Sequence, residues 1–107
     1  MKIQTIGIVG QGFVGTALRE VFSGYYRVYT YDKAHTNLST HTSVQALSHA
    51  CDVIFVCVPT PMKPDGSCDT SIVETVCKAA CGTGRRNIVV IKSTVPPGTT
   101  SYLNEVC

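Results

Sequence analysis

The sequence has 107 residues, of which 44% are hydrophobic and 15% charged, and its nine basic and seven acidic residues give a formal net charge of +2. This composition excludes a disordered chain, and the length suits one domain with one hydrophobic core. The basic residues are scattered, with Arg85-Arg86 as the only adjacent pair, which argues against a nucleic-acid-binding surface. No apolar run reaches the roughly 18 residues of a membrane span, and no signal-peptide pattern precedes the first strand. We therefore expect a soluble, cytoplasmic protein.

The six cysteines are spread along the chain and form no C-x-x-C pair, which argues against a zinc site. Without a secretory signal we expect reduced thiols that behave as small hydrophobic residues, rather than a disulfide scaffold. Cys68 and Cys107 are expected to be the most exposed of them.

The first part of the chain alternates between strand and helix patterns. Residues 3–9 form a continuous apolar run, which is typical of a strand buried on both faces, and residues 26–31 are aromatic and β-branched, as in a second strand. Between them residues 13–23 have helical periodicity, and Gly24 is expected to end the helix. The predicted inner stripe of this helix is Phe13, Val14, Ala17, Leu18, Val21 and Phe22.

A polar stretch with little pattern follows, in which residues 40–42 are the candidate for a brief edge strand. Ser43 is a candidate N-cap for a short helix through Ala50. Residues 52–58 form the strongest strand pattern in the chain. The three prolines and one glycine of residues 59–68 indicate a loop and exclude both helix and ladder.

Asp69 is expected to cap a helix over residues 70–80, followed by a buried strand at residues 87–91 and a last helix that begins near Thr99. The predicted inner face of the 70–80 helix is Ile72, Val73, Val76, Cys77 and Ala80. Alternating strands and helices predict an α/β fold, a parallel sheet with helices on both faces. Right-handed crossovers then give the Rossmann-type doubly wound topology, with strand order 3-2-1-4-5. We expect residues 1–107 to form a single domain that resembles the first part of a longer protein.

Residues 7–15 read Gly-Ile-Val-Gly-Gln-Gly-Phe-Val-Gly and place three glycines in the G-x-G-x-x-G spacing between a strand and a helix. In a dinucleotide site Gly10 would make the tight turn, Gly12 would let the backbone approach a pyrophosphate, and Gly15 would let the helix pack closely on the sheet. The alternative is an ordinary strand-turn-helix. The flanking elements, and an acidic residue about twenty positions further on, favour the dinucleotide site.

Asp32 is that acidic residue, at the end of the second strand. Its carboxylate would accept hydrogen bonds from the adenosine ribose and repel a 2′-phosphate, so the predicted cofactor is NAD rather than NADP. The alternative is a turn residue at a strand end. The adjacent Lys33 would reduce the repulsion between Asp32 and a 2′-phosphate if it lay near the site. We favour the alternative that it is a solvated surface lysine.

Two loops leave the carboxyl ends of buried strands, where ligands of open parallel sheets bind. Residues 58–61 and 92–96 each place a hydroxyl just past a strand, close to prolines. Thr60 and Thr94 would reach the ribose or nicotinamide end of the cofactor. The alternative is that both hydroxyls cap local turns.

Four motifs in this order resemble a known family. They are the glycine loop, Cys-Val-Pro-Thr-Pro at residues 57–61, Asp-Thr-Ser-Ile-Val-Glu at 69–74 and Ile-Lys-Ser-Thr-Val-Pro-Pro-Gly at 91–98. Over nearly the whole chain they look like the N-terminal NAD-binding domain of the UDP-glucose/GDP-mannose dehydrogenases. That family oxidises the C6 alcohol of a nucleotide sugar to a carboxylate and reduces two NAD.

The resemblance implies that the glycine loop contacts the pyrophosphate and Asp32 the adenosine ribose, with residues 56–60 and 93–95 lining the rest of the cofactor. The threonine matching Thr94 helps to position a water or hydroxyl near the reacting carbon, which makes Thr94 the candidate catalytic residue. The candidate cofactor-binding residues are Gly10, Gln11, Gly12, Phe13, Val14, Gly15, Asp32, Lys33, Val58, Pro59, Thr60, Ser93, Thr94 and Val95. No metal is predicted.

The family's catalytic cysteine lies in a later Cys-x-Pro-Lys-Asp context that this sequence lacks, so none of the six cysteines is assigned that role. The linking helix and the UDP-binding domain are missing too. The sequence therefore predicts the NAD-binding domain of a UDP-glucose 6-dehydrogenase-like enzyme, inactive by itself, with the nucleotide sugar bound only in a complete enzyme. The alternative is a stand-alone dinucleotide-binding module that sequesters NAD, or that pairs with a partner chain or a second copy through an apolar surface around residues 95–106.

Overall fold

A four-stranded parallel sheet forms the centre of the molecule. The computed structural model describes residues 3–34, 36–81 and 87–93. The strands lie in the order β2-β1-β3-β4, and they are β1 (Thr5–Val9), β2 (Arg27–Tyr31), β3 (Val53–Val56) and β4 (Ile88–Ile91). In the central strand β1, Ile8 pairs with Thr30 of β2 on one side and with Phe55 of β3 on the other.

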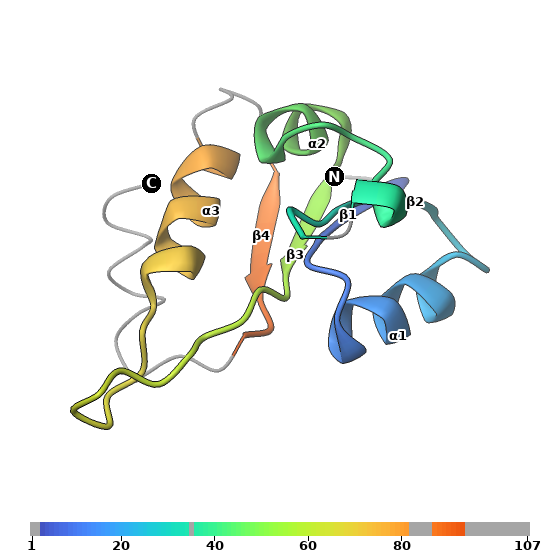
Figure 1. Cartoon of the computed structure of the whole chain (residues 1–107). Coiled ribbons are helices and arrows are strands. Elements are labelled where there is room, and N and C mark those ends of the chain that lie inside the picture. Colours follow the sequence, from blue (N-terminus) through green and yellow to red (C-terminus); the bar gives the residue numbers. More distant parts are fainter. Residues whose placement is uncertain (1–2, 35, 82–86, 94–107) are drawn as a thin grey trace.

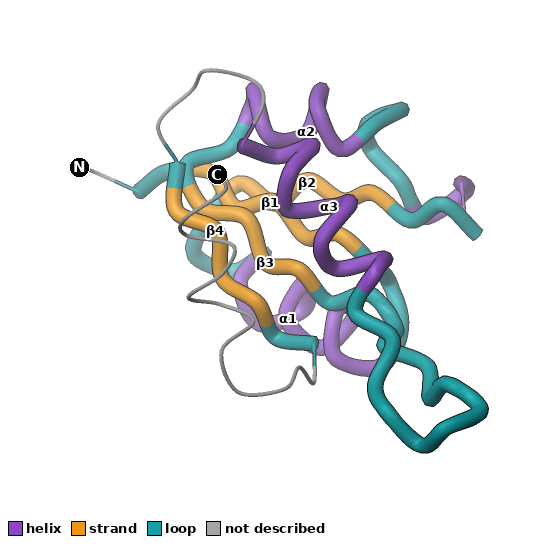
Figure 2. The backbone as a smooth tube through the Cα atoms, turned by 90° about the vertical axis from the view of Figure 1, so that its left-hand side faces the viewer, coloured by secondary structure: helices purple, strands orange, loops and turns teal. Residues whose placement is uncertain are grey.

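Helices cover both faces of this sheet, as the sequence predicts (Figures 1 and 2). Helix α1 (Phe13–Phe22) lies on one face over β1 and β2, while α2 (Val44–Ala50) and α3 (Ser71–Cys81) pack together on the other. The Ser43 side chain accepts a hydrogen bond from the Ala46 N–H and so caps α2, as predicted. In the described part of the chain, no helix is long and apolar enough to cross a membrane.

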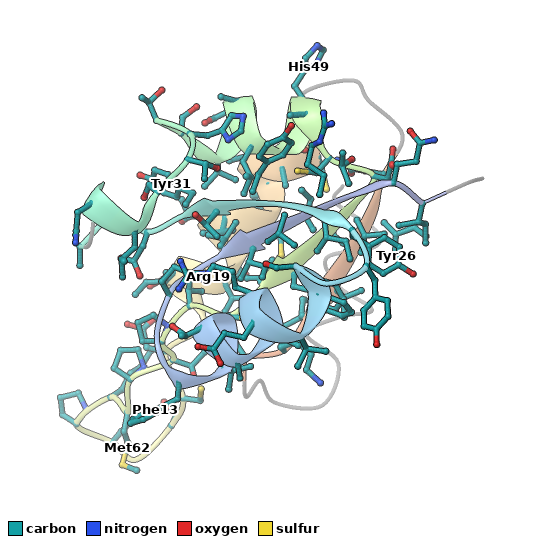
Figure 3. The ribbon with its side chains drawn as sticks, turned by 90° about the vertical axis from the view of Figure 1, so that its right-hand side faces the viewer. Phe13, Arg19, Tyr26, Tyr31, His49 and Met62 are labelled. Atoms are coloured by element: carbon teal, nitrogen blue, oxygen red, sulfur yellow. The ribbon has the colours of Figure 1, made fainter. Side chains whose placement is uncertain are left out.

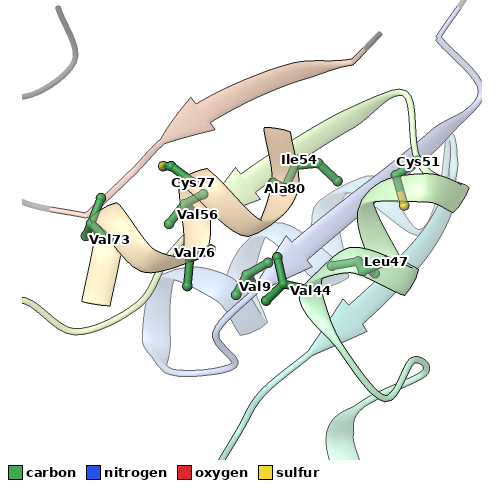
Figure 4. Close-up of a cluster of buried hydrophobic side chains, with 10 residues drawn as sticks. All are labelled: Val9, Val44, Leu47, Cys51, Ile54, Val56, Val73, Val76, Cys77 and Ala80. Carbon is green, nitrogen blue, oxygen red and sulfur yellow. The ribbon is translucent and has the colours of Figure 1, made fainter. Parts of the chain in front are cut away.

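The main core lies between the sheet and the α2/α3 layer (Figure 4). Alternate residues of the strands face this layer, because successive side chains of a strand point to opposite faces. Its buried members are Val9, Val44, Leu47, Cys51, Ile54, Val56, Val73, Val76, Cys77 and Ala80. The predicted inner face of α3 is confirmed except at Ile72, which is 38% exposed.

The predicted edge strand at residues 40–42 does not form, so the strand order 3-2-1-4-5 lacks its first member within the described residues. Polar groups satisfy the outer edge of β2 instead. The Thr40 hydroxyl accepts a hydrogen bond from the Thr30 N–H at 2.9 Å, and the Thr30 carbonyl accepts one from the Thr40 N–H at 2.9 Å. The Ser39 hydroxyl accepts one from the Asp32 N–H at 2.8 Å. Because the Thr40 and Ser39 hydroxyls and the Thr40 N–H provide these bonds, the edge is covered without a fifth strand.

The predicted inner stripe of α1 is wrong at several positions. Phe13 is fully exposed, and Val14 and Val21 are 48% and 61% exposed. The helix turns Gly15 to the interior, and Phe22, seven residues later, stacks on Phe55 at 5.3 Å between ring centroids. With Gly15 facing the sheet, the helical period directs Phe13 and Val21 away from it. The predicted end of this helix at Gly24 is confirmed, since α1 ends at Phe22 and Ser23 is its C-cap, although Gly24 reaches this end without a positive φ.

The loop after β3 contains a short antiparallel pairing, so the prediction that its prolines exclude a ladder is wrong at this point. Met62 bridges to Cys68, and the Lys63 N–H donates to the Ser67 carbonyl at 2.7 Å. The prolines occupy positions that do not donate in this pairing, and Gly66 closes the turn with φ +88°. The loop therefore extends as an ordered arm beyond the ends of the strands (Figure 1). The helix predicted near Thr99 lies outside the described residues.

Candidate functional site

A cleft of about 740 Å³ opens at the carboxyl ends of β1 and β2. Its volume is within the range of pockets that hold small organic molecules, roughly 300–1,000 Å³. Its lining comes from Val9 and Gly10, from the end of β2 and the residues after it, from Val44, from Val58 and Pro59, and from the first turns of α3. In an open parallel sheet, ligands bind at this edge.

Gly10 makes the turn that leads out of β1. Its φ is +98°, which L side chains rarely adopt, and a Cβ there would lie 2.6 Å from the Cys57 carbonyl oxygen. The Gly10 N–H donates to the Tyr31 carbonyl at 2.8 Å, and the Cys57 N–H donates to the Val9 carbonyl at 2.8 Å. These contacts fix the turn between the ends of β2 and β3.

The other two glycines of the motif differ sharply in their surroundings. A Cβ on Gly15 would collide with the Gly10 carbonyl oxygen, so the start of α1 packs directly on the turn. A Cβ on Gly12 would have no described atom within 4 Å. Gly12 therefore leaves open space at the N-terminus of a ten-residue helix, a location that favours negatively charged groups.

Asp32 joins the glycine turn to the end of β2. Its Oδ2 accepts a hydrogen bond from the Gln11 N–H at 2.7 Å, and its Oδ1 accepts one from the Ala34 N–H at 2.8 Å. The partly buried carboxylate also lines the cleft. Asp32 is therefore held in one orientation by backbone groups, beside the space that a ligand would occupy.

Gln11 places an unpaired acceptor within the same turn. The residue is 5% exposed, and its Nε2 donates to the Gly10 carbonyl at 3.2 Å. Its Oε1 is buried and has no hydrogen-bond partner among the described residues. Buried polar atoms are normally paired with protein, water or ligand, so this orphaned oxygen fits a turn that is completed by water or ligand.

The remaining predicted site residues divide into three groups. Lys33, Val58 and Pro59 line the cleft with Asp32 and Gly10. Phe13, Val14, Thr60 and Ser93 lie outside its lining. Thr94 and Val95 lie outside the described residues.

Sequence reasoning missed the wall that α3 contributes to the cleft, formed by Ser71, Ile72, Thr75 and Val76. Asp69 is the sequence signal that could have indicated this wall. Its Oδ1 accepts a hydrogen bond from the Ser71 N–H at 2.9 Å and so helps to fix where α3 begins. Hydrogen bonds from Ser71 hold the pKa of the Asp69 carboxyl below its usual value, so this carboxylate, one position before Thr70, whose carbonyl accepts the hydrogen bond from the Glu74 N–H, stays charged at neutral pH. The exposure of Ile72 on an otherwise buried helix face is explained by the cleft.

Cys57 lies beside the glycine turn, and partial burial disfavours the thiolate form of its side chain. Burial raises the pKa of this thiol to about 11, while the nearby Lys92 ammonium opposes the shift. A thiol acts as a nucleophile only when it is deprotonated. The raised pKa therefore disfavours a nucleophilic role for Cys57 at neutral pH.

We expect Cys57 in the folded chain to resist iodoacetamide at pH 8 and to react progressively faster as the pH approaches 11. With a pKa two units above the ordinary value of 9.0, its thiolate fraction below pH 9 is about one hundredth of that in the unfolded chain. Alkylation of the Cys57 peptide, followed by mass spectrometry, measures this rate. The same peptide in urea is the control, and equal rates at pH 8 in both states would contradict the expectation.

Residues 23–107 match the model of the UDP-glucose/GDP-mannose dehydrogenase family, NAD binding domain. The match begins after α1, so the glycine turn is an independent observation. A GDP-mannose 6-dehydrogenase of Pseudomonas aeruginosa is 46% identical over 52 residues, which are 45% of this chain and 12% of that protein. The UDP-glucose 6-dehydrogenase YwqF of Bacillus subtilis is 36% identical over 72 residues, 66% of this chain and 16% of that protein. The chain thus spans less than a fifth of these curated relatives.

Solved structures of similar proteins have the same fold. A UDP-glucose dehydrogenase from the hyperthermophilic archaeon Pyrobaculum islandicum matches with a TM-score of 0.81 and 27% identity, over 97% of this chain and 33% of that one. A GDP-mannose dehydrogenase from Pseudomonas aeruginosa, solved as a ternary complex, matches with a TM-score of 0.80 and 26% identity, over 92% of this chain and 30% of that one. Since the family model covers most of the chain and the fold agrees, the chain belongs to the UDP-glucose/GDP-mannose dehydrogenase family and corresponds to its NAD-binding domain.

Proposed function

We propose that this chain holds NAD along the carboxyl ends of β1, β2 and β3 and is the cofactor domain of a nucleotide-sugar dehydrogenase. The observation that carries the proposal is the linkage of Asp32 to the glycine turn, with open space at Gly12 on one side and the cleft on the other. A dinucleotide has a charged centre and a purine nucleoside at one end, and these two spaces suit those parts.

Each part of the site has a proposed task. The backbone of residues 10–15 binds the pyrophosphate, with Gln11, Phe13 and Val14 placed by the turn and the first residues of α1. Asp32 accepts the ribose hydroxyls, with Lys33 beside it, and Val58 and Pro59 form an apolar wall of the same cleft. Thr60, Ser93, Thr94 and Val95 are proposed for the nicotinamide half, and Thr94 for orienting the reacting oxygen. When bound, NAD supplies the acceptor for the hydride that leaves the sugar.

The chain by itself is proposed to bind NAD weakly and not to oxidise a nucleotide sugar. It spans a small part of the curated relatives, and the thiol beside the glycine turn is held neutral by burial. Turnover of UDP-glucose by the purified 107-residue chain would overturn this part of the proposal.

We expect the wild-type chain to bind NAD at least tenfold more tightly than NADP, and Asp32→Ala to weaken NAD binding and abolish this preference. The carboxylate would repel a 2′-phosphate, and its removal also releases the Gln11 N–H that it holds. Isothermal calorimetry with both cofactors measures the two affinities.

The matched control for Asp32→Ala is Asp65→Ala, which changes the net charge equally but lies on the exposed tip of the loop after β3. It should leave both affinities unchanged. Equal affinities of the wild-type chain for NAD and NADP would count against the role of Asp32, and no binding of either would count against the proposed function.

A second candidate function is a dinucleotide-binding module that pairs with a partner chain. Phe13 is fully exposed and Met62 is 77% exposed, and both lie at the end of the molecule where the strands end (Figure 3). Exposed apolar side chains of this size are common at interaction surfaces. The surface predicted around residues 95–106 lies outside the described residues. A monomer by size-exclusion chromatography, with and without NAD, would argue against obligate pairing.

A further inference from the structure

The wall of the cleft formed by Val58 and Pro59 lies beyond the last ladder pair of β3. That pair joins Val56 to Ile91 of β4, so the chain after Val56 leaves the sheet. Both wall residues nevertheless line the same cleft as Asp32. The position of this wall therefore depends on contacts other than the ladder.

Ser93 provides such a contact from the end of β4. Its hydroxyl lies 2.7 Å from the Val58 carbonyl oxygen and 3.3 Å from that of Val56. Its N–H donates to the Val56 carbonyl at 3.2 Å, next to the Lys92 N–H at 2.9 Å. A hydroxyl has one proton, and the shorter distance directs it to Val58. Ser93 itself lies outside the cleft lining.

The same segment is supported on its other side by the glycine turn. A Cβ on Gly10 would lie 2.6 Å from the Cys57 carbonyl oxygen and 3.2 Å from the Val58 nitrogen, so the two backbones are in close contact. The segment from Val56 to Val58 is thus fixed between Gly10 and Ser93. Loss of either support would let the wall move away from Asp32.

We infer that Ser93 is a positioning residue, which holds the Val58–Pro59 wall through its hydrogen bond to the Val58 carbonyl and so sets the affinity for the adenosine half of the cofactor. The inference rests on the proposed NAD site and changes the role of Ser93 within it. A hydroxyl that contacted the nicotinamide half would affect NAD alone. A hydroxyl that positions this wall, in the same cleft as Asp32, affects ADP as well, because ADP retains the adenosine and ends before the nicotinamide.

The test uses the full chain and two ligands, NAD and ADP, measured by calorimetry. Ser93→Ala should weaken both by about threefold to tenfold, the effect of one lost hydrogen bond. Ser93→Cys keeps the size with a weaker donor and should also weaken both. Ser93→Thr retains the hydroxyl and should restore both affinities. Ser67→Ala, in the exposed loop away from the cleft, is the control and should leave both unchanged.

A second measurement follows the bond itself. The ¹³C shift of the Val58 carbonyl should change in Ser93→Ala and Ser93→Cys and return in Ser93→Thr. Unchanged ADP affinity in Ser93→Cys, or a loss confined to NAD, would overturn the inference while leaving the NAD site intact. If Ser93→Ala fails to fold, Ser93→Cys and Ser93→Thr decide the question. A wild-type chain that binds neither ligand overturns the proposed function instead.

Discussion

Gly15→Ala is expected to lower the free energy of unfolding by at least about 3 kcal/mol, the scale of severe overpacking in a buried site. The added Cβ would collide with the Gly10 carbonyl oxygen, and both groups belong to the backbone, so no side-chain rotation relieves the contact. Alanine favours a helix over glycine by about 1 kcal/mol, which is too little to offset the collision. Relief requires α1 to move away from the turn, and this would separate Phe22 from Phe55.

Thermal and urea unfolding measure this effect. For a chain of this length, a loss of 3 kcal/mol corresponds to a fall in Tm of roughly 12 °C or more. Gly24→Ala is the matched control, because the nearest described atom to its Cβ is the Val21 carbonyl oxygen at 4.0 Å and its φ is not positive. That variant should differ from the wild type by less than about 1 kcal/mol. A Gly15→Ala chain as stable as the control would show that α1 does not rest on the Gly10 carbonyl.

The elements that could be predicted from the sequence are those whose local residue pattern is compatible with only one secondary structure. The apolar runs of β1 and β3 are buried on both sides of the sheet, and such runs identify central parallel strands. Ser43 caps α2 because its side chain satisfies the first turn locally. In both cases the residues that determine the structure are neighbours in sequence.

The errors arise where a distant contact decides the outcome. Hydrophobic periodicity placed Phe13 inside α1, but the contact of Gly15 with the Gly10 carbonyl sets the rotation of the helix, and a glycine adds nothing to a hydrophobic stripe. The edge strand at residues 40–42 was expected from composition, whereas the Thr40 hydroxyl pairs with Thr30 in its place. Neither contact leaves a periodic signal.

The candidate site divides in the same way. The glycine turn and Asp32 are encoded by spacing, because helix α1, a turn and strand β2 fix the distance between them. Ile72 and Thr75 join the cleft through the crossover that brings α3 to the sheet, and Ser93 reaches Val58 through the register of β3 and β4. These contacts join residues that are far apart in the sequence, so neither the spacing of residues nor a motif predicts them.

Gly12→Ala is expected to weaken NAD binding at least tenfold, about 1.4 kcal/mol, while the fold remains intact. Gly12 has an extended backbone with φ −80° and ψ −154°, so it needs no positive φ, and no described atom lies within 4 Å of its Cβ position. Gly12 is the N-cap of α1, where alanine in place of glycine costs about 1 kcal/mol or less. The space at Gly12 is therefore not required by the protein's own packing.

The loss of affinity in Gly12→Ala should be selective for ligands that carry a pyrophosphate. A methyl group at Gly12 would stand between the helix N-terminus and a pyrophosphate, so NAD and ADP should both bind more weakly, whereas adenosine, which has no phosphate, should bind as it does to the wild type. Calorimetry with the three ligands, together with thermal unfolding, separates this effect from destabilisation. Gly15→Ala should lower the stability of the fold, whereas Gly12→Ala should lower only the affinity for ligands with a pyrophosphate. The two variants would therefore show that two glycines of one motif have different roles. Unchanged ADP affinity in Gly12→Ala would place the pyrophosphate away from the glycine turn.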